Sequence, residues 1–318
     1  MIINMKKFNW IKKGLIFKVK SFDINSIKSR AMLPTPILFK NFIRVYYTAL
    51  DKHGNSSVYI CDLNIKDPSK IISIYKKPIL EKGSPGFFDD SGVLATSALR
   101  YKNKIYLYYN GYTKKVTTPY SINIGLAISD RSGLDFKKFS TSPILDRSKE
   151  DPLFTTGSNV IFKNRKFKMW YTSCTEWLDV NNKLLESNYC IKYAQSNDGI
   201  NWNRNNVICI SSKTEAIAKS SVFFHKNLYH MFFCYRGLKN FRGGKDSYKI
   251  GYAYSNNGTS WIRKDKIGNH HLGIKKEWDD NMQCYPSIIK IKNKLFMFYN
   301  GNNFGYEGFG LSYLDLNY

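Results

Sequence analysis

Acidic residues are scarce in this sequence. Its 318 residues include 24 Asp and Glu against 49 Lys and Arg, which gives a formal net charge of +25 at pH 7. Such a charge raises the local concentration of anionic partners, including nucleic acid, anionic membranes, acidic glycans and nucleotide sugars. The lysines are nevertheless spread over every segment, and no block of five or more basic residues occurs. Because dedicated polyanion sites show clustered charge, we expect a diffusely basic protein without a specific nucleic acid partner.

Long apolar runs and paired cysteine motifs are also missing. No stretch reaches the roughly 18 apolar residues needed to span a bilayer, and the basic N-terminus, interrupted by Lys12 and Lys13, lacks the cleavage site of a secretory signal. The cysteines form no C-x-x-C pair and have no histidine at metal-ligand spacing: Cys61, Cys174, Cys190, Cys209, Cys234 and Cys284. We therefore expect free thiols, no metal or cofactor, and a cytoplasmic location. The basic first twenty residues with Trp10 predict at most a weak contact with an anionic membrane surface.

The chain does contain a repeat. The stretch 284–301 reappears in altered form at 34–48, 96–111, 157–172 and 219–234. Each copy consists of runs of four to eight β-branched and aromatic residues bounded by Asn, Lys, Gly or Asp, which is the pattern of β-strands. No segment shows the sustained i, i+3, i+4 apolar stripe of a helix.

A recurring turn defines the outer half of the repeat. The segments 189–202 and 248–261 match at most positions and share the pattern Ser-x-[Asp/Asn]-Gly-x-x-Trp, in which Asp-Gly or Asn-Gly supplies a tight hairpin. One unit is then four antiparallel strands over roughly 45 to 60 residues, which is typical of a propeller blade. The sequence predicts an all-β, five-bladed β-propeller forming a single domain over 1–318. Residues 1–28 would supply an edge strand or close the ring.

Candidate chemistry lies where each blade begins, because the loops entering the innermost strands of a propeller converge on one mouth. Four of the five blade entries carry a carboxylate, and paired carboxylates are the usual apparatus of glycosyl transfer. Glu215 is the first choice for a general acid, because Ala216, Ile217 and Ala218 offer apolar surroundings that raise a carboxyl pKa. Asp89 is its expected partner. The alternative is that these acids only cap loops.

Several segments together resemble known proteins. Phe88-Asp-Asp-Ser-Gly-Val, Asp151-Pro-Leu-Phe-Thr-Thr, Met169-Trp-Tyr-Thr-Ser, Trp278-Asp-Asp, Tyr285-Pro-Ser-Ile and Phe298-Tyr-Asn-Gly-Asn, with the Ser-Asn-Asp-Gly-Ile-Asn-Trp turn, look like the five-bladed glycosidase-like propellers. That superfamily includes glycoside hydrolase families 43, 32 and 130, and the likeness runs from about Pro34 to the C-terminus. This sequence most resembles a bacterial glycosidase-like branch of the superfamily.

The resemblance implies roles for individual residues. It implies that Asp89 or Asp90, Asp151, Glu215 and Asp279 or Asp280 face the central pocket. It also suggests that sugar hydroxyls or an anionic group are bound by Arg236, Tyr285, Asn300 and Asn302. Arg236 has the alternative of a structural ion-pair residue. Trp177 and Trp278 are the aromatic residues that we expect in mouth loops, where they would stack on sugar rings or pack against the protein.

The first blade departs from the family pattern. Families 43 and 32 place a catalytic aspartate at its entry, whereas residues 31–36 contain no acid and the nearest, Asp51, follows the second strand. We therefore expect a carbohydrate-active enzyme carrying out glycosyl transfer, as a hydrolase or phosphorylase. A phosphorylase and a glycosyltransferase that uses a nucleotide sugar both suit these residues and the basic charge better than hydrolysis by the family-43 scheme. A glycosyltransferase of surface-polysaccharide synthesis that uses a nucleotide sugar is the alternative. A non-catalytic propeller that binds glycans or polyanions is a third possibility.

Overall fold

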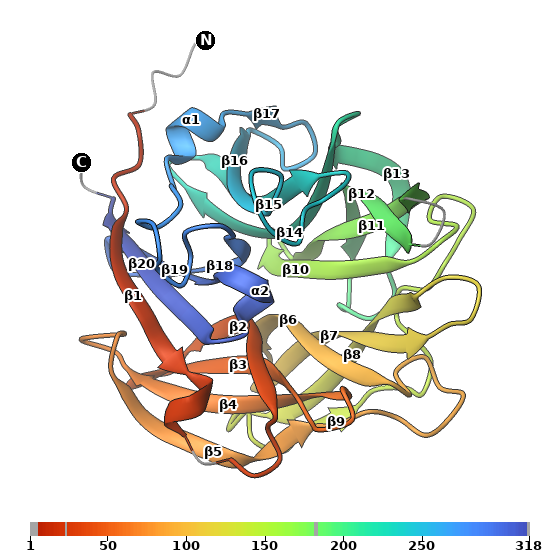
Figure 1. Cartoon of the computed structure of the whole chain (residues 1–318), viewed down its shortest axis with the longest axis horizontal. Helices are drawn as coiled ribbons and strands as arrows, with labels where there is room; N and C mark the ends of the chain where they lie inside the picture. Colours follow the sequence, from red (N-terminus) through yellow and green to blue (C-terminus); the bar gives the residue numbers. More distant parts are fainter. Residues whose placement is uncertain (1–5, 23, 181–183, 317–318) are drawn as a thin grey trace.

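The computed structural model describes residues 6–22, 24–180 and 184–316, and these residues fold almost entirely into antiparallel β-sheet (Figure 1). Helical turns are short: η1 (Val19–Ser21), α1 (Asp265–Gly268) and α2 (Asn302–Gly305). None of the helices in these ranges is long and apolar enough to cross a membrane. The six cysteines are all buried and unpaired.

The strands of the described residues pair in sets of four. The first two sets are β2 (Ser29–Leu38), β3 (Phe42–Leu50), β4 (Ser56–Asn64) and β5 (Ile71–Leu80), then β6 (Gly92–Tyr101), β7 (Lys104–Lys114), β8 (Tyr120–Asp130) and β9 (Lys137–Lys138). The next two are β10 (Thr155–Lys163), β11 (Lys166–Val180), β12 (Leu184–Ser196) and β13 (Asn203–Ile210), then β14 (Glu215–His225), β15 (Leu228–Gly237), β16 (Lys249–Ser255) and β17 (Ile262–Arg263). The last set is β18 (Cys284–Ile291), β19 (Lys294–Asn300), β20 (Gly308–Asp315) and β1 (Ile11–Lys18).

The first strands of these sets lie side by side around the middle of the molecule. Strand β2 contacts β6, and contacts continue from β6 to β10, from β10 to β14, from β14 to β18, and from β18 back to β2. In Figure 1 these strands lie toward the centre, whereas β1, β5 and β13 lie toward the rim. The closure uses both ends of the chain, because β1 pairs antiparallel with β20. Within the ranges that the structure describes, the direct ladder between two sets consists of one parallel pair, Ser56 with Gly92.

A hydrogen bond of one kind recurs at four of the five junctions between neighbouring sets. A side chain on the second strand of one set accepts a hydrogen bond from a backbone N–H on the first strand of the following set. The pairs are Ala95 to Thr48 (3.1 Å), Gly157 to Asn110 (3.0 Å), Lys219 to Thr172 (3.0 Å) and, across the closure, Leu33 to Asn300 (2.8 Å). The donors lie at or beside register shifts in the first strands, where the ladder leaves backbone groups unpaired.

The recurrent Asx-Gly turn has a matching role. Its glycine carbonyl accepts a hydrogen bond from an aromatic side chain on the second strand of the preceding set, as in Tyr108 to Gly199 (3.0 Å) and Trp170 to Gly258 (2.8 Å). The glycines adopt φ of +78° and +83°, a conformation that other residues reach only with strain. The repeat seen in the sequence therefore fixes contacts between neighbouring sets as well as the turn itself.

Candidate anion-binding site

Three of the predicted acids share one structural arrangement. Each carboxylate is buried, accepts a hydrogen bond from a tyrosine on the second strand of its own set, and forms an ion pair with a lysine. These groups are Asp89 with Tyr109 (3.2 Å) and Lys138 (2.6 Å), Asp151 with Tyr171 (2.9 Å) and Lys192 (3.0 Å), and Asp279 with Tyr299 (3.0 Å) and Lys12 (2.7 Å). Asp151 also contacts Arg204 at 3.1 Å.

Each of the three aspartates has its partners within its own set of strands. The partners of Asp89 and Asp151 come from their own sets, and Lys12 lies on β1, which belongs to the set of Asp279. In the described residues no aspartate of this group contacts another. The arrangement is that of buried ion pairs within a set, so the catalytic assignment of Asp89 and Asp151 stays a prediction without support from their contacts.

Asp90 and Asp280 cap loops. Asp90 accepts the N–H of Gly86 (3.1 Å), and Asp280 accepts the N–H of Lys276 (2.7 Å) and the side-chain amide of Asn302 (2.8 Å). The carbonyl oxygen of Asn302 in turn accepts backbone N–H groups of the loop 281–282. The loop-capping alternative weighed for the acids describes Asp90 and Asp280 well.

Glu215 does not have the apolar surroundings expected from its neighbours in the sequence. Its carboxylate lies 2.5 Å from Arg263 on β17, and the side chain remains 28% exposed. The reason is strand alternation: Ala216 and Ala218 point to the opposite face of β14, so Ile217 alone of the three apolar neighbours lies on the face of the carboxylate. Glu215 is therefore held in an ion pair at the edge of the fourth set.

Trp278 and Asn300 serve packing. The indole of Trp278 lies against Gly301 and Gly310, where an added Cβ would come within 2.4 Å of a ring atom. The side-chain amide of Asn300 is fully buried and donates to the carbonyls of Ala31 (2.7 Å) and Gly308 (2.9 Å). Trp278 therefore packs within the last set, and Asn300 joins that set to β2.

Arg236 is in a different environment. Its guanidinium is 1% exposed and donates to the carbonyl of Ser187 (2.5 Å) and to the hydroxyls of Tyr248 (3.1 Å) and Tyr189 (3.3 Å), while its central carbon lies 3.5 Å from the ring centroid of Phe241. None of its contacts within the described residues is a carboxylate. Buried charges in proteins are normally paired, so a buried guanidinium without a carboxylate partner is a candidate group for binding an anion.

Tyrosines surround this guanidinium. The hydroxyl of Ser187 bridges the hydroxyls of Tyr120 (2.9 Å) and Tyr189 (2.8 Å). On the other side, the ring of Tyr248 lies 6.3 Å from that of Tyr285. We call Tyr120, Tyr189, Arg236, Tyr248 and Tyr285 the arginine–tyrosine cluster.

Four of the five sets of strands contribute to this cluster. Burial raises the pKa of Tyr248 and of Tyr285 well above the usual value, so both hydroxyls stay protonated and can donate hydrogen bonds.

Two further aromatic side chains pack against the cluster. Trp177, predicted at the mouth, packs on Tyr120 at 5.2 Å, and Phe304 of α2 packs on Tyr248 at 5.8 Å. Figure 1 places α2 near the middle of the ring of strands.

Lys219 is a second buried cation, and the sequence reasoning missed it. It is 3% exposed, occupies the register shift of β14 with φ of +38°, and its ammonium donates to the carbonyl of Ser220 at 3.2 Å. Burial lowers the pKa of Lys219 to about 8. Lys219 and Arg236 both lie within electrostatic range of the Cys234 thiol, whose pKa burial raises to about 12.

The repeat contained a signal for Lys219. Aligned copies place Lys219 with Gly157 and Tyr285, and all three occupy register shifts with φ of +38°, +58° and +56°. A left-handed conformation in residues other than glycine is strained and often accompanies functional sites. A charged residue at this position of an apolar repeat is therefore the feature that could have identified it.

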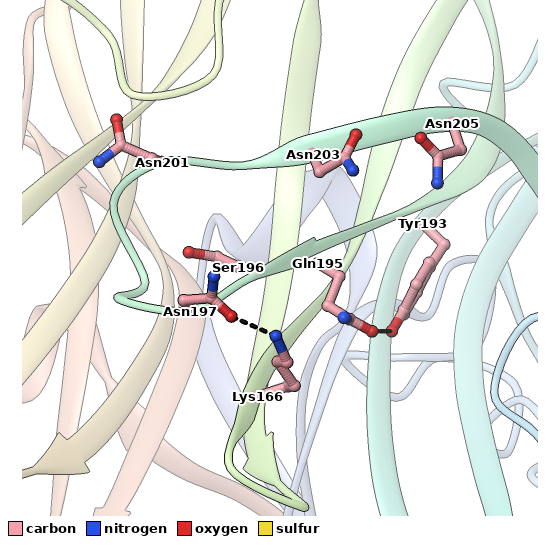
Figure 2. Close-up of a pocket in the computed structure, with 8 residues that line it drawn as sticks. All are labelled: Lys166, Tyr193, Gln195, Ser196, Asn197, Asn201, Asn203 and Asn205. Carbon is pink, nitrogen blue, oxygen red and sulfur yellow. Dashed lines mark hydrogen bonds between the residues drawn. The ribbon is translucent and has the colours of Figure 1, made fainter.

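Two cavities lie away from this cluster. One of about 250 Å³ lies beside β12 and β13 (Figure 2). The other, of about 1160 Å³, lies between residues 6–11 and the turn joining β14 to β15, and its rim carries Lys6, Lys7, Lys226 and Lys294. Across the parts of the chain that the structure describes, no group of three or more His, Cys, Asp or Glu side chains is arranged to hold a metal ion.

Solved structures share this fold. A member of glycoside hydrolase family 130, a family of mannoside phosphorylases that contains glycoside hydrolases, superposes with a TM-score of 0.70 at 14% identity, covering 100% of this chain and 97% of that one. A thermostable family-43 glycoside hydrolase gives 0.65 at 17% identity, covering 91% and 90%. The family-32 β-fructofuranosidase of Bombyx mori gives 0.60 at 12% identity, covering 92% and 62%. The likeness to families 43, 32 and 130 is thus confirmed at the level of the β-propeller fold.

Relatives by sequence extend over nearly the whole chain. No family model matches it. The uncharacterized proteins MT1551 and Rv1502, from two strains of Mycobacterium tuberculosis, are each 32% identical to it over 311 residues, covering 96% of this chain and 99% of theirs. With this identity over this length, and with the fold described above, the chain belongs to the protein family of MT1551 and Rv1502.

Proposed function

We propose that the protein is a carbohydrate-active enzyme that binds an anionic carbohydrate, or a carbohydrate together with phosphate, at the arginine–tyrosine cluster. The observation that carries this proposal is the buried guanidinium of Arg236, which is surrounded by aromatic rings and hydroxyls and contacts no carboxylate among the described residues. Aromatic faces and hydroxyl donors suit a sugar ring, and a guanidinium suits a carboxylate or phosphate.

The second cation favours a phosphoryl group over a carboxylate. Lys219 and Arg236 flank Cys234, and neither has a carboxylate partner in the ranges that the structure describes. One carboxylate would leave one of the two buried charges uncompensated, whereas a phosphate dianion matches both. A sugar phosphate, a nucleotide sugar or inorganic phosphate supplies such a group.

The reaction that we propose is glycosyl transfer of the phosphorylase type. Phosphate would attack the anomeric carbon while a carboxylic acid protonates the leaving oxygen, so one acid and one cationic site suffice. Glu215 is the candidate acid, since it pairs in register with Gly237, the residue after Arg236. To act, its carboxyl group would have to leave Arg263 and turn toward the cluster.

Within the same proposal the ring has five blades, each made of one set of four strands, and the protein works in the cytoplasm. Support for the blade number comes from the five first strands that contact one another in a closed order. Support for the location comes from six buried, unpaired cysteines.

One observation favours non-catalytic binding as a second candidate. All four leading acids, Asp89, Asp151, Glu215 and Asp279, are held in ion pairs. A propeller that recognises a phosphorylated glycan without turning it over would need the cluster alone.

Binding and turnover assays on the purified protein test these proposals. Titration calorimetry with inorganic phosphate and with sugar 1-phosphates should show binding that Arg236→Gln abolishes and Arg263→Gln retains. Phosphorus NMR of the protein with oligosaccharides and phosphate should then show release of a sugar phosphate. Release of a nucleotide from a sugar donor would instead identify a glycosyltransferase, and binding without turnover would identify the non-catalytic function. If no anion binds, the assignment of the site is wrong.

A further inference from the structure

A small pocket at the outer edge of the third set of strands is independent of the arginine–tyrosine cluster. It has a volume of about 250 Å³ and lies beside the last two strands of the set, β12 and β13. Figure 2 shows Asn203 and Asn205 on β13, with Tyr193 and Gln195 of β12 across from them. Five side-chain amides line this space: Gln195, Asn197, Asn201, Asn203 and Asn205.

A bulge in β13 opens the pocket. The ladder pairs Tyr193 with Val207 and the next residue, Ala194, with Arg204, so Asn205 and Asn206 are extra residues on β13. Asn206 adopts φ of +51°, the left-handed conformation that lets the strand arch outward. Bulges of this kind redirect side chains and are frequent beside binding sites.

Several of the amides are available to a ligand. Gln195 accepts a hydrogen bond from the hydroxyl of Tyr193 (3.1 Å) through its carbonyl oxygen, so its NH₂ group is not used in that bond. The side chains of Asn203 and Asn205 make no hydrogen bond to any other residue of the described chain. Lys166 is engaged by the side-chain oxygen of Asn197, and no carboxylate lines the described pocket.

The structure assigns to this pocket the binding of a single neutral sugar ring, as a subsite for a carbohydrate chain. Each amide offers a donor and an acceptor, as each sugar hydroxyl does, so neighbouring hydroxyls of one ring can pair with Gln195, Asn203 and Asn205. The volume lies below the roughly 300–1,000 Å³ typical of pockets for drug-sized ligands, which limits the occupant to a small group. An added peptide strand is disfavoured, because the bulge interrupts the regular edge that strand addition requires.

This subsite stands apart from the proposed function. It needs neither Arg236 nor catalysis, because all of its lining residues belong to the third set of strands. If the proposed anion site is wrong, the neutral subsite can still be present, and the converse also holds.

Side-chain amide resonances provide the test. Glucose, mannose and galactose are each titrated to tens of millimolar into the full-length protein. At least one of these sugars should shift the NH₂ signals of Gln195 and Asn203 in a saturable way. The double variant Asn203→Ala, Asn205→Ala should weaken that binding by about tenfold or more, since two hydrogen bonds are lost. Asn256→Ala, an exposed asparagine at the other cavity, is the matched control and should leave the affinity unchanged.

Three results would overturn the subsite. One is that no hexose shifts these signals, and another is that the double variant retains full affinity while its NMR spectrum shows an intact fold. The third is that inorganic phosphate shifts the same signals as strongly as the sugars, which would mean that the pocket is not selective for neutral groups.

Discussion

Arg236 donates a 2.5 Å hydrogen bond from its guanidinium to the backbone carbonyl of Ser187, which ties β15 to the long β11–β12 hairpin. The bond holds a buried cation at a place where sets three and four meet, and where the described surroundings supply hydroxyls and rings but no carboxylate. We infer that the donor groups for the proposed anion are already in position before it binds, because the guanidinium is held in place without the ligand.

Arg236→Met should change binding far more than stability. Removing a buried charge that lacks a counter-charge relieves its desolvation cost, and this gain offsets the loss of the hydrogen bonds to Ser187, Tyr189 and Tyr248. We therefore expect a change in the free energy of unfolding of about 1 kcal/mol or less. Binding of phosphate should fall by at least about tenfold. Chemical denaturation and calorimetry measure the two effects.

Arg44→Met is the contrasting variant. It leaves the carboxylate of Asp62, which lies 2.7 Å from Arg44 in the native protein, buried and without its counter-charge, and should lower the free energy of unfolding by about 3–5 kcal/mol. Equal losses of stability in both variants would contradict the interpretation of Arg236.

Lys219 should make stability rise with pH in the alkaline range. Its pKa is about 8 in the folded protein against 10.5 when exposed, so between these values the unfolded chain binds the additional proton. Folding is then favoured progressively as pH increases from about 8 to 10.5, by about 3 kcal/mol in total. Denaturation curves across this range should show the slope in the native protein and lose it in Lys219→Met. A slope that persists in the variant would assign the effect to other groups.

Saturating phosphate should flatten the slope of the native protein, because a bound anion stabilises the charged amine.

Asp151→Asn should destabilise the protein whatever its catalytic role. The substitution leaves Lys192 buried with its charge uncompensated, so we expect a loss of about 3–5 kcal/mol in the free energy of unfolding. Burial works against the charged form of Asp151, but hydrogen bonds from Ser173 and Lys192 outweigh it and lower its pKa below the usual 3.8. Its contribution is therefore complete above pH 3.8 and is lost as pH falls through the lower folded-state value.

Acid denaturation of the native protein and the variant measures this difference. Asp90→Asn, which alters a partly exposed loop cap, is the control and should change stability by about 1 kcal/mol or less. A fully stable Asp151→Asn protein that has lost turnover would instead support the catalytic assignment.

The cavity beside residues 6–11 offers a test of the expected membrane contact. Lysines at its rim should attract anionic lipid by about 1 kcal/mol each, an effect that salt screens. Vesicles containing phosphatidylglycerol should therefore sediment the protein at low salt, and the double variant Lys226→Ser, Lys294→Ser should reduce this association. Lys52→Ser, which lies in the turn between β3 and β4, serves as the control. Equal binding to neutral phosphatidylcholine vesicles would show that charge is not the cause.

The propeller fold could be predicted from the sequence because its determinants are local and repeated. A strand pattern, a turn and a second-strand side chain at one spacing recur in each copy, and the same positions make the hydrogen bonds between sets, as with Thr48, Asn110 and Thr172. Arg236 and Tyr285, both predicted as binding residues, lie together in the structure, since both belong to the arginine–tyrosine cluster. That cluster remained invisible as a whole because Tyr120, Tyr189 and Tyr248 look like ordinary strand residues.

The sequence by itself determined the repeat, the strand order within it and the excess of positive charge. Only the tertiary structure decided which charges are neutralised. Asp279 meets Lys12 from the opposite end of the chain and Asp89 meets Lys138 in an outer strand, whereas Arg236 and Lys219 meet no carboxylate among the described residues. The physical reason is that a strand pattern is read over a few residues, whereas the free energy of a buried charge depends on groups that folding brings from far along the chain.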